Sequence, residues 1–372
     1  MRGRTNEYIR RAIQLYKTGM AKSKVAKIIS EEYNIEYNDA LRRKLSRNID
    51  SNLEKYADEQ GIPVENISYY WHKGKSYSIF ATNKVSMEEV AKRIVDDVKN
   101  YSYDYKFPDP IDYGEEGCLL IINPADLHIG KYASTTETGN SSYNIIEAVD
   151  ACIECIYQLT SAASVYPISK IVFVGGNDVL HTDNTRRTTT KGVPQDTDGM
   201  WFEAFEAAKS LYIGMVEHLL SLAPVHFVYC PSNHDYMSGY FLADVVSSWF
   251  HKVDTFTCDV SPSHRKYINF DTNLIGFTHG DGARTANLPL LMAHEAPDAW
   301  SACQHKYIYT HHVHHKVAKD YMSVCVESMR SLSPADSWHH KMGFQHAPRT
   351  MEAFVHHPQR GQIARITHAL AP

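Results

Sequence analysis

The sequence predicts an α/β fold with covered sheets, preceded by a small helical domain. Three observations favour it: short apolar runs recur from Cys118 onward, amphipathic segments lie between them, and the first fifty residues have helical spacing. Short apolar runs that alternate with helices are typical of buried strands in layered α/β domains. A length of 372 residues allows two or three domains. We divide the chain into 1–50, 51–116 and 117–372.

The composition excludes several classes of protein. No run of about 18 apolar residues occurs, so no membrane span is predicted. The start, MRGRTNEYIRR, is charged and lacks the apolar core of a secretory signal. The seven cysteines show no regular spacing, which is typical of a reducing compartment, so we expect an intracellular, cytoplasmic protein. The unusual number is 21 histidines.

The first fifty residues have a charge opposite to that of the rest. Twelve Lys and Arg against six Asp and Glu give +6 there, which leaves −11 for the remainder of a chain with net charge −5. A basic module on an acidic body favours contact with nucleic acid. Helical spacing predicts three helices: one around 8–16 that Gly19 ends, one capped by Ser23, and one from about Asn38 to Ile49.

The third predicted helix is basic and follows a short turn. This order is the helix-turn-helix pattern, in which the second helix of the pair contacts DNA. The DNA-binding candidates on it are Arg42, Arg43, Lys44 and Arg47. The alternative interpretation is a small helical cap whose basic residues are only solvated.

Residues 51–116 are predicted to connect the two main parts. Aromatic residues around Trp71 favour a small β-hairpin, and the capping box from Ser86 to Glu89 predicts a helix after it. The segment 101–117 contains Pro and Gly without periodicity and is predicted to be a linker.

Apolar runs and amphipathic segments predict the elements of the main domain. The predicted strands are CLLIIN (118–123), KIVFVGG (170–176), VHFVYC (225–230), NLIGFTHG (273–280), YIYT (307–310), VCVES (324–328) and the piece QIARITHAL (362–370). Helices are predicted over 145–163 and 201–223. Cys152 and Cys155 fall inside the first of these helices, so we expect buried packing rather than a metal site.

Polar side chains follow five of the predicted strands, in chain order. The motifs are Asp126-Leu127-His128, Asn177-Asp178-Val179-Leu180-His181, Ser232-Asn233-His234-Asp235, His279-Gly280-Asp281 and His311-His312-Val313-His314-His315. Sites in α/β sheets are built at the carboxyl ends of strands. Imidazole, carboxylate and amide ligands without a thiolate suit Mn, Fe or Zn rather than a structural zinc site. The sequence therefore predicts a metal site at this edge.

Spacing adds to this prediction. Asp126 and His128 lie two residues apart, as do His312 and His314, so in extended backbone each pair points to one side. The doublets His339-His340 and His356-His357 are attributed to chance in a His-rich chain.

The motif series resembles the calcineurin-like metallophosphoesterase superfamily over roughly residues 118–330. The segments 178–181 and 233–235 are most similar to its nuclease branch, which includes Mre11 and bacterial SbcD. The resemblance implies a two-sheet αββα sandwich and a metal-dependent phosphoesterase. It also implies two divalent ions, with Mn²⁺ first and Fe, Zn or Mg as other occupants.

The resemblance also implies a role for each motif residue. One metal would be held by Asp126, His128 and His314, and the second by Asn233, His279 and His312, with Asp178 bridging them. The general acid would be His234, oriented by Asp235, with His181 beside the reacting phosphate.

Three positions depart from the family pattern. The chain has Gly-Gly-Asn-Asp where the family has Gly-Asp, so either Asn177 takes the ligand place or one residue is inserted. We choose Asp178, because a bridge between two cations needs a carboxylate and the three-residue step to His181 is kept. Ser232 and His311 stand where the family has glycine.

Basic residues near the motifs are candidates for contact with substrate. Two divalent ions can activate a hydroxide and brace an in-line displacement at phosphorus, and cations nearby would counter the charge that develops. The candidates are Arg186, Arg187 and Lys191 in the Thr-rich loop after His181, and Arg330 after the strand VCVES.

The predicted function is a DNA nuclease, with DNA as partner. The alternatives are a phosphatase or phosphodiesterase acting on small nucleotides or proteins, and a DNA-binding or scaffold protein with a decayed site; the full ligand set argues against the last. Only 58 residues follow His314, so we expect no coiled-coil ATPase partner of the kind that SbcD has. A compact enzyme of the kind phages encode fits this organisation, and an oligomer is left open.

Overall fold

The computed structural model describes residues 2–17, 20–59, 70–73, 78–81, 92, 105–139, 142–344 and 347–371. The chain divides into two compact units, residues 1–95 and 96–372, which we describe separately. Within these described ranges, no helix combines the length and the apolar content needed to cross a lipid bilayer.

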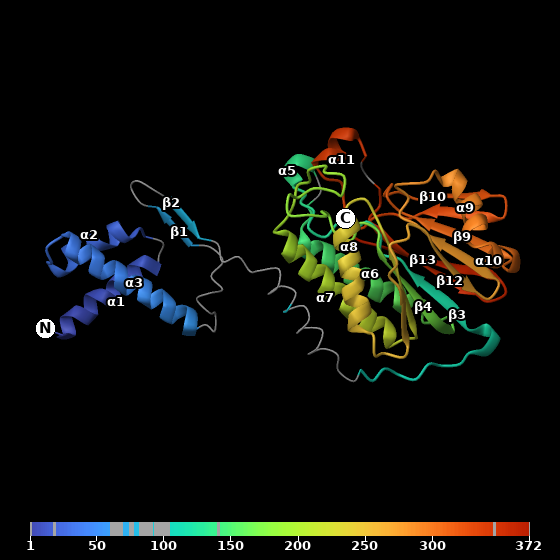
Figure 1. The fold of residues 1–372 in the computed structure, drawn as a ribbon, viewed down its shortest axis with the longest axis horizontal. Helices are drawn as coiled ribbons and strands as arrows, with labels where there is room; N and C mark the ends of the chain where they lie inside the picture. The colour runs from blue at the N-terminus through green and yellow to red at the C-terminus, as the bar shows by residue number, and fades with distance from the viewer. Residues whose placement is uncertain are drawn as a thin grey trace. The chain divides into compact units, whose positions relative to one another are not determined.

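The first unit is a three-helix cluster with a hairpin (Figure 1). Its elements are α1 (Arg2–Lys17), α2 (Lys22–Tyr33), α3 (Asp39–Glu59) and the antiparallel strands β1 (Tyr70–Lys73) and β2 (Ser78–Ala81). Apolar residues at helical spacing build its core: Tyr8, Ala12, Leu15, Val25, Ala26, Ile29, Leu41, Leu45 and Ile49 are buried. The three predicted helices and the hairpin are therefore present.

The helix ends of this unit differ in part from the prediction. Ala21, not Ser23, occupies the N-cap position of α2, so Ser23 lies inside the first turn. Asn34 ends α2 with a φ of 49°, and Asn38 caps α3 by accepting the Leu41 N–H at 2.9 Å. α3 continues ten residues beyond the predicted end at Ile49. The capping box from Ser86 to Glu89 lies outside the described residues.

The second unit contains two sheets. The six-stranded sheet has the order β13-β12-β3-β4-β5-β6, made of β13 (Gly361–Ala369), β12 (Thr350–His357), β3 (Cys118–Ile122), β4 (Ile168–Gly176), β5 (Val225–Cys230) and β6 (Phe256–Asp259). The five-stranded sheet has the order β10-β11-β9-β8-β7, made of β10 (Val317–Tyr321), β11 (Val324–Ser328), β9 (His305–Thr310), β8 (Asn273–Phe277) and β7 (Lys266–Phe270). β3 to β6 are parallel, as are β8, β9 and β11.

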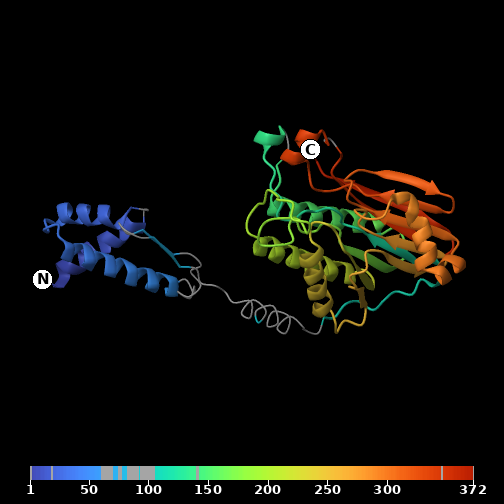
Figure 2. The ribbon, with the colours of Figure 1, turned by 45° about the horizontal axis from the view of Figure 1, so that its top comes forward.

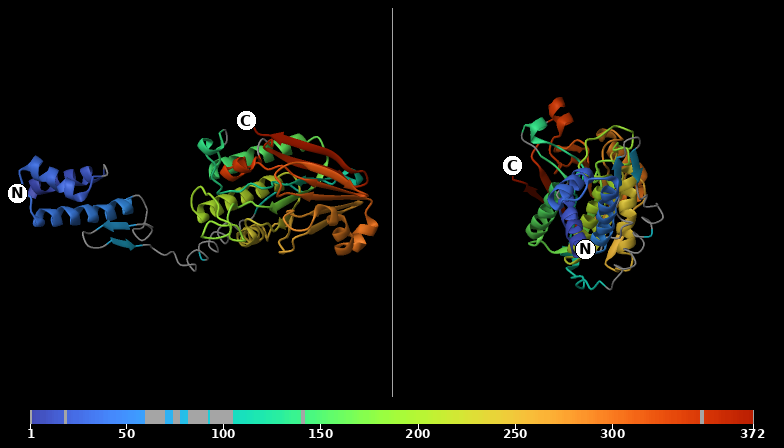
Figure 3. Two further views of the ribbon diagram at one scale, coloured as in Figure 1. Left: turned by 90° about the horizontal axis from the view of Figure 1, so that it is seen from above. Right: turned by 90° about the vertical axis from the view of Figure 1, so that its left-hand side faces the viewer.

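Helices cover both outer faces, so the layers run helix, sheet, sheet, helix (Figures 2 and 3). α6 (Ile145–Ala163), α7 (Trp201–Leu220) and α8 (Tyr236–Trp249) share one core with the six-stranded sheet. α9 (Leu288–Glu295) and α10 (Pro297–Ala302) pack on the five-stranded sheet. The core between the sheets includes Leu119, Val172, Val228, Ile275, Phe277 and Phe354. The predicted α/β fold with an αββα sandwich is confirmed.

Part of the predicted linker is packed rather than extended in solvent. The Tyr105 hydroxyl donates to Glu217 Oε1 at 2.6 Å and accepts the indole N–H of Trp249 at 3.0 Å. Its ring stacks on Phe107 with centroids 5.3 Å apart. Aromatic residues in a segment that lacks periodicity therefore fasten it to α7 and α8. Cys152 and Cys155 are buried in α6, as predicted.

A buried group of charges ties the two sheets together at one end. Arg365 on β13 donates to Glu327 on β11 and, at 3.1 Å, to Glu352 on β12. Both carboxylates are almost inaccessible, at 4% and 3% exposure. One planar guanidinium thus bonds to two buried carboxylates from different sheets, which an ammonium cannot do with the same geometry.

We expect Arg365→Lys to lower the free energy of unfolding by about 2 kcal/mol, the cost of a lost hydrogen bond to a buried charge. The measurement is urea unfolding of the full chain in EDTA, followed by tryptophan fluorescence. Arg360→Lys is the matched control, because Arg360 pairs with Glu116 at an exposed site. Equal midpoints for the two variants would contradict the expectation.

Candidate metal centre

The carboxyl ends of strands from both sheets meet at one edge of the second unit. Loops leave β3, β4 and β5 in one sheet and β8 and β9 in the other just before the polar motifs. Two of these loops are joined by backbone hydrogen bonds: Asp126 N–H donates to the Asn177 carbonyl at 2.8 Å, and His128 N–H to the Asp178 carbonyl at 2.9 Å. The loops therefore hold each other in place.

Asp126, His128 and His314 form the first cluster, with one ligand atom of each within 4.8 Å of the others. His314 Nε2 lies 3.4 Å from Asp126 Oδ1 and 3.3 Å from His128 Nε2. Burial and the neighbouring imidazoles hold the pKa of His128 well below its usual value, so its ring is neutral with a lone pair available. This is the form of histidine that binds a cation.

Asp178, His279 and His312 form the second cluster, again within 4.8 Å. His279 Nε2 lies 3.2 Å from Asp178 Oδ2 and 3.0 Å from the side-chain oxygen of Asn233. Both predicted ligand sets are thus brought together. His312 is exposed and His314 is half-buried, so the centre opens to solvent on the side of the β9 loop.

Asp178 lies between the clusters. Its Oδ2 atom is 3.2 Å from His279 Nε2 and 4.0 Å from His128 Nε2, which belong to different clusters. The side chain of Asn177, the other residue considered for the bridging position, is buried beside the Cys230 thiol. The geometry therefore favours Asp178 as the shared carboxylate.

The donor set fits divalent metal ions. The ligand atoms face one another in a largely buried space: His128 Nε2 lies 3.3 Å from His314 Nε2, which lies 3.4 Å from Asp126 Oδ1. A cation placed among these atoms would bind their lone pairs. Imidazole, carboxylate and amide donors suit Mn, Fe or Zn. The clusters can hold two ions, but they do not decide which metal.

The backbone of the predicted ligands is left-handed, not extended. Positive φ angles occur at Asp126 (51°), His128 (49°), Asp178 (59°), His312 (70°) and His314 (56°). The side chains of each pair, Asp126 with His128 and His312 with His314, therefore converge because the backbone is left-handed at each residue. The extended backbone expected from the two-residue spacing was wrong. Such residues cost roughly 1–3 kcal/mol each and persist where surrounding contacts fix them, as they do at functional sites.

The hydroxyl of Ser232 makes two hydrogen bonds inside this loop that a glycine could not make. The hydroxyl accepts the Asp178 N–H at 2.7 Å and donates to Asp235 Oδ1 at 2.5 Å. Asp235 Oδ2 accepts the Leu180 N–H at 2.9 Å. Burial and the charge of Asp178 raise the pKa of Asp235 to about 7. Ser232 and Asp235 thus position the loop that carries Asp178.

His234 is held differently from the prediction. Its Nδ1–H donates to the carbonyl of His181 at 2.9 Å, and its backbone N–H donates to Asp178 Oδ1 at 2.9 Å. Asp235, which was expected to orient this imidazole, instead bonds to Ser232 and Leu180. That expectation needs correction, because both carboxylate oxygens of Asp235 are engaged by Ser232 and Leu180, and His234 Nδ1 is engaged by the His181 carbonyl.

His181 lies beside both His128 and His234, and its place next to the reacting phosphate stays a prediction. Its Nδ1 is 3.2 Å from His128 Nδ1, and its ring stacks on that of His234 with centroids 5.4 Å apart. His311, the other position noted for departing from the motif series, is buried and pairs through Nε2 with the side-chain oxygen of Asn123 at 2.9 Å. Its imidazole also stacks parallel to His279, so it supports the centre.

The Thr-rich loop lies next to the centre. The Thr190 N–H donates to the carbonyl of Asn233 at 3.1 Å, which fastens the loop to a predicted ligand. Arg186, Arg187 and Lys191 are exposed on this loop, and Arg187 reaches the sulfur of Met200 at 3.5 Å. Their contact with substrate stays a prediction.

Arg330 is paired inside the fold, and its contact with substrate stays a prediction. Its guanidinium lies 3.4 Å from the buried carboxylate of Glu352, so it joins the charge group that ties the sheets together. The neighbouring Ser331 contacts the centre instead, because its hydroxyl donates to the Asp126 carbonyl at 2.7 Å.

The sequence analysis did not predict that α11 (Ser337–Met342) packs against a predicted metal ligand. The ring of His339 stacks on that of His314, with centroids 5.5 Å apart and planes inclined by 20°. Its Nδ1–H donates to Asp336 at 2.7 Å, and Asp336 pairs with the buried Lys131 at 3.2 Å. The signal in the sequence is Asp336 three residues before His339, which is a helix N-cap pattern and predicts that this histidine lies on a helix.

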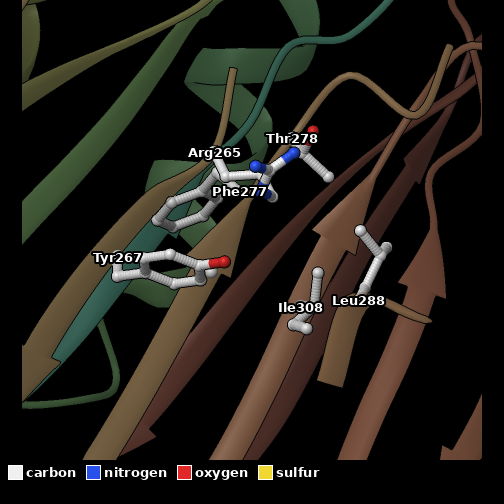
Figure 4. Close-up of a pocket in the computed structure, with 7 residues that line it drawn as sticks. Arg265, Tyr267, Phe277, Thr278, Leu288 and Ile308 are labelled. Carbon is white, nitrogen blue, oxygen red and sulfur yellow. The ribbon is translucent and has the colours of Figure 1, made fainter. Parts of the chain in front are cut away.

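One further depression lies on the five-stranded sheet, and Thr278, the residue before His279, is part of its lining (Figure 4). It is too small to admit a water molecule and is lined by residues that include Arg265, Tyr267, Leu288 and Ile308. Glu295 holds the Arg265 guanidinium through both carboxylate oxygens, with Nε to Oε2 at 2.8 Å. The depression is therefore part of the packing of α9 on the sheet.

Comparison with known proteins gives structural similarity only. No protein-family model matches the chain, and no curated protein matches it. An archaeal phosphodiesterase aligns with 68% of this chain and 99% of its own at 9% identity and a TM-score of 0.30. A zinc complex of Vps29 from Entamoeba histolytica aligns over 68% and 98% at 10% identity and a TM-score of 0.27. A predicted phosphoesterase from Streptococcus pneumoniae aligns over 68% and 99% at 11% identity and a TM-score of 0.26.

Proposed function

We propose that this protein is a two-metal phosphodiester hydrolase of the calcineurin-like superfamily, and that it cleaves DNA as nucleases of the Mre11 and SbcD kind do. The observation that carries the proposal is the pair of adjacent clusters with Asp178 between them. Paired metals about 3.5–4 Å apart are suited to in-line displacement at phosphorus, because they brace both the attacking and the leaving oxygen.

Seven side chains would hold the ions, with Mn²⁺ as the first candidate: Asp126, His128, Asp178, Asn233, His279, His312 and His314. Bound there, divalent ions would polarise the phosphoryl group and acidify water. His234 would protonate the departing oxygen, because its Nδ1–H is engaged by the His181 carbonyl and Nε2 is the nitrogen left to act. His181, buried beside it, keeps the ring in place.

The basic face of α3 supports DNA as substrate. Arg43 and Arg47 are exposed one turn apart on α3 and share an open surface with Ala40, Lys44 and Asn48. The turn of residues 34–38 and the preceding α2 complete a helix-turn-helix arrangement. Arg42 is paired with Asp39 at 3.2 Å, so we infer that Arg43 and Arg47 make the main phosphate contacts.

The test is Mn²⁺-supplemented hydrolysis of linear double-stranded DNA, single-stranded DNA and bis-p-nitrophenyl phosphate. We expect Arg43→Ala/Arg47→Ala to lower kcat/KM on DNA. The slope of log kcat/KM against log salt concentration should become less steep by roughly two, one for each phosphate contact removed, while hydrolysis of the small diester is unchanged. Lys24→Ala/Lys27→Ala, which removes two exposed charges from α2, is the matched control.

The outcomes separate the alternatives. Small-diester hydrolysis without cleavage of either DNA would reject the nuclease and favour a phosphodiesterase or phosphatase of small nucleotides or proteins. An equal loss of DNA cleavage in both double variants would reject α3 as the DNA-binding face. No hydrolysis of any substrate with Mn²⁺, Fe²⁺ or Zn²⁺ would reject the enzyme.

A further inference from the structure

A line of rings leads from the candidate metal centre to the surface. His339 stacks on His314, Trp338 meets the ring of His339 edge-on at 5.0 Å, and Phe344 lies 5.8 Å from Trp338. The indole and the phenyl ring at the end of this line are 57% and 60% exposed. Two large aromatic side chains are therefore exposed to solvent, and only the ring of His339 separates Trp338 from the predicted metal ligand His314.

The surface that carries these rings is anchored to the centre. Asp336 caps α11 by accepting the His339 N–H at 3.0 Å, and its other oxygen pairs with Lys131 at 3.2 Å. Lys131 is 1% exposed, lies three residues after His128, and also donates to the Pro334 carbonyl at 2.7 Å. α11 also lies beside α5 (Thr135–Thr138), which follows the same loop (Figure 1). A buried cation thus fixes the distance between the aromatic rings and the loop of His128.

The chemistry of this surface suits a nucleobase. Exposed aromatic rings stack on bases without regard to sequence, because every base has a π-face. The last turn of α11 adds the exposed side chains of His340 and Lys341, which suit a phosphate backbone that passes over them. Phosphoserine and phosphothreonine carry no planar group next to the phosphate on which this pair of rings could stack.

We propose that Trp338, supported by Phe344, stacks an unpaired base of the substrate next to the scissile phosphodiester. This inference rests on the proposed phosphodiester hydrolysis and narrows its substrate to nucleoside phosphodiesters in single-stranded or frayed DNA. A base inside an intact duplex cannot reach the rings, because both of its faces are covered by its neighbours. Trp338 is thus a specificity-determining residue, and Lys131 and Asp336 are positioning residues.

The experiment compares three esters that share one leaving group: thymidine 5′-(p-nitrophenyl phosphate), thymidine 3′-(p-nitrophenyl phosphate) and methyl p-nitrophenyl phosphate. With the full chain and Mn²⁺, Trp338→Ala should raise KM for one of the nucleoside esters by about 10-fold and leave its kcat within about twofold. KM for the methyl ester should be unchanged. Trp338→Phe should retain most of the preference, and Phe241→Ala, which truncates a 52% exposed ring on α8, is the matched control.

Each failure is distinguishable. If the wild type hydrolyses none of the esters, the proposed function fails. If it hydrolyses them and Trp338→Ala leaves KM for both nucleoside esters unchanged, the stacking proposal is overturned while the hydrolase stands. If Trp338→Ala changes the methyl ester as much as the nucleoside esters, the indole acts on His339 and His314 rather than on a base, which also overturns the proposal.

Discussion

Asp178→Asn is expected to reduce hydrolysis of bis-p-nitrophenyl phosphate by more than about 100-fold and to lower the number of bound metal ions. Loss of a partner that merely orients a metal ligand costs about 10–100-fold in affinity or activity, so loss of the carboxylate shared by two ions should cost more. The amide keeps the size of the side chain and can still accept the His234 N–H that Asp178 Oδ1 accepts at 2.9 Å. The effect therefore reports the missing charge.

Metal content and kcat/KM are the two measurements, taken on protein loaded with Mn²⁺ and passed through a desalting column. Asn177→Gly tests the neighbouring position, because glycine tolerates the φ of 56° found there, and it should retain both ions. Asp150→Asn, at an exposed position of α6, controls for loss of a surface charge. If Asn177→Gly loses the ions and Asp178→Asn keeps them, the assignment of the bridging residue is reversed.

The elements of the second unit were predictable where the hydrophobic pattern is strong. The helix predicted over 145–163 is α6 to the residue, and the runs at 118–123 and 225–230 are β3 and β5 to within one residue. The site was predictable for the same reason: parallel strands end at a common edge, so polar residues that follow successive strands are brought together. β6, β7, β10 and β12 were not predicted, because their residues alternate or carry charges without a sustained apolar run.

What the sequence could not supply is the arrangement of groups that are distant along the chain. Lys131 pairs with Asp336 more than two hundred residues away, and Arg365 joins two carboxylates from different sheets. Nothing in the local spacing of these residues indicates a partner. The left-handed backbone at Asp126 and His314 was also missed, since residues other than glycine adopt it only where tertiary contacts impose it. Local patterns identified the residues of the centre, and tertiary contacts decide their geometry.

The affinity for a divalent ion is expected to rise about tenfold per pH unit up to about pH 9. Burial alone would lower the pKa of His279, but the carboxylates of Asp178 and Asp126 raise it to about 9 in the metal-free protein. An ion must therefore displace one proton from His279 below that pH. Burial lowers the pKa values of His128 and His312, so these rings are already neutral near pH 7 and release no further proton. Between pH 7 and pH 9 the gain amounts to roughly 100-fold.

The same proton has the opposite effect on the metal-free fold. Because the pKa of His279 is higher in the folded chain than in the unfolded one, its protonation stabilises the metal-free protein fully below about pH 6.5, and this contribution is lost as the pH rises through about 9. Thermal unfolding in EDTA should thus lose stability over that window, while the stabilisation added by Mn²⁺ should grow. Calorimetric titration in two buffers of different ionisation enthalpy at pH 7 should count one released proton in the wild type and none in His279→Gln, with His226→Gln as the control. Metal affinity that is flat from pH 6.5 to pH 9 would show that His279 is neutral before the ion arrives and is not held protonated by Asp178.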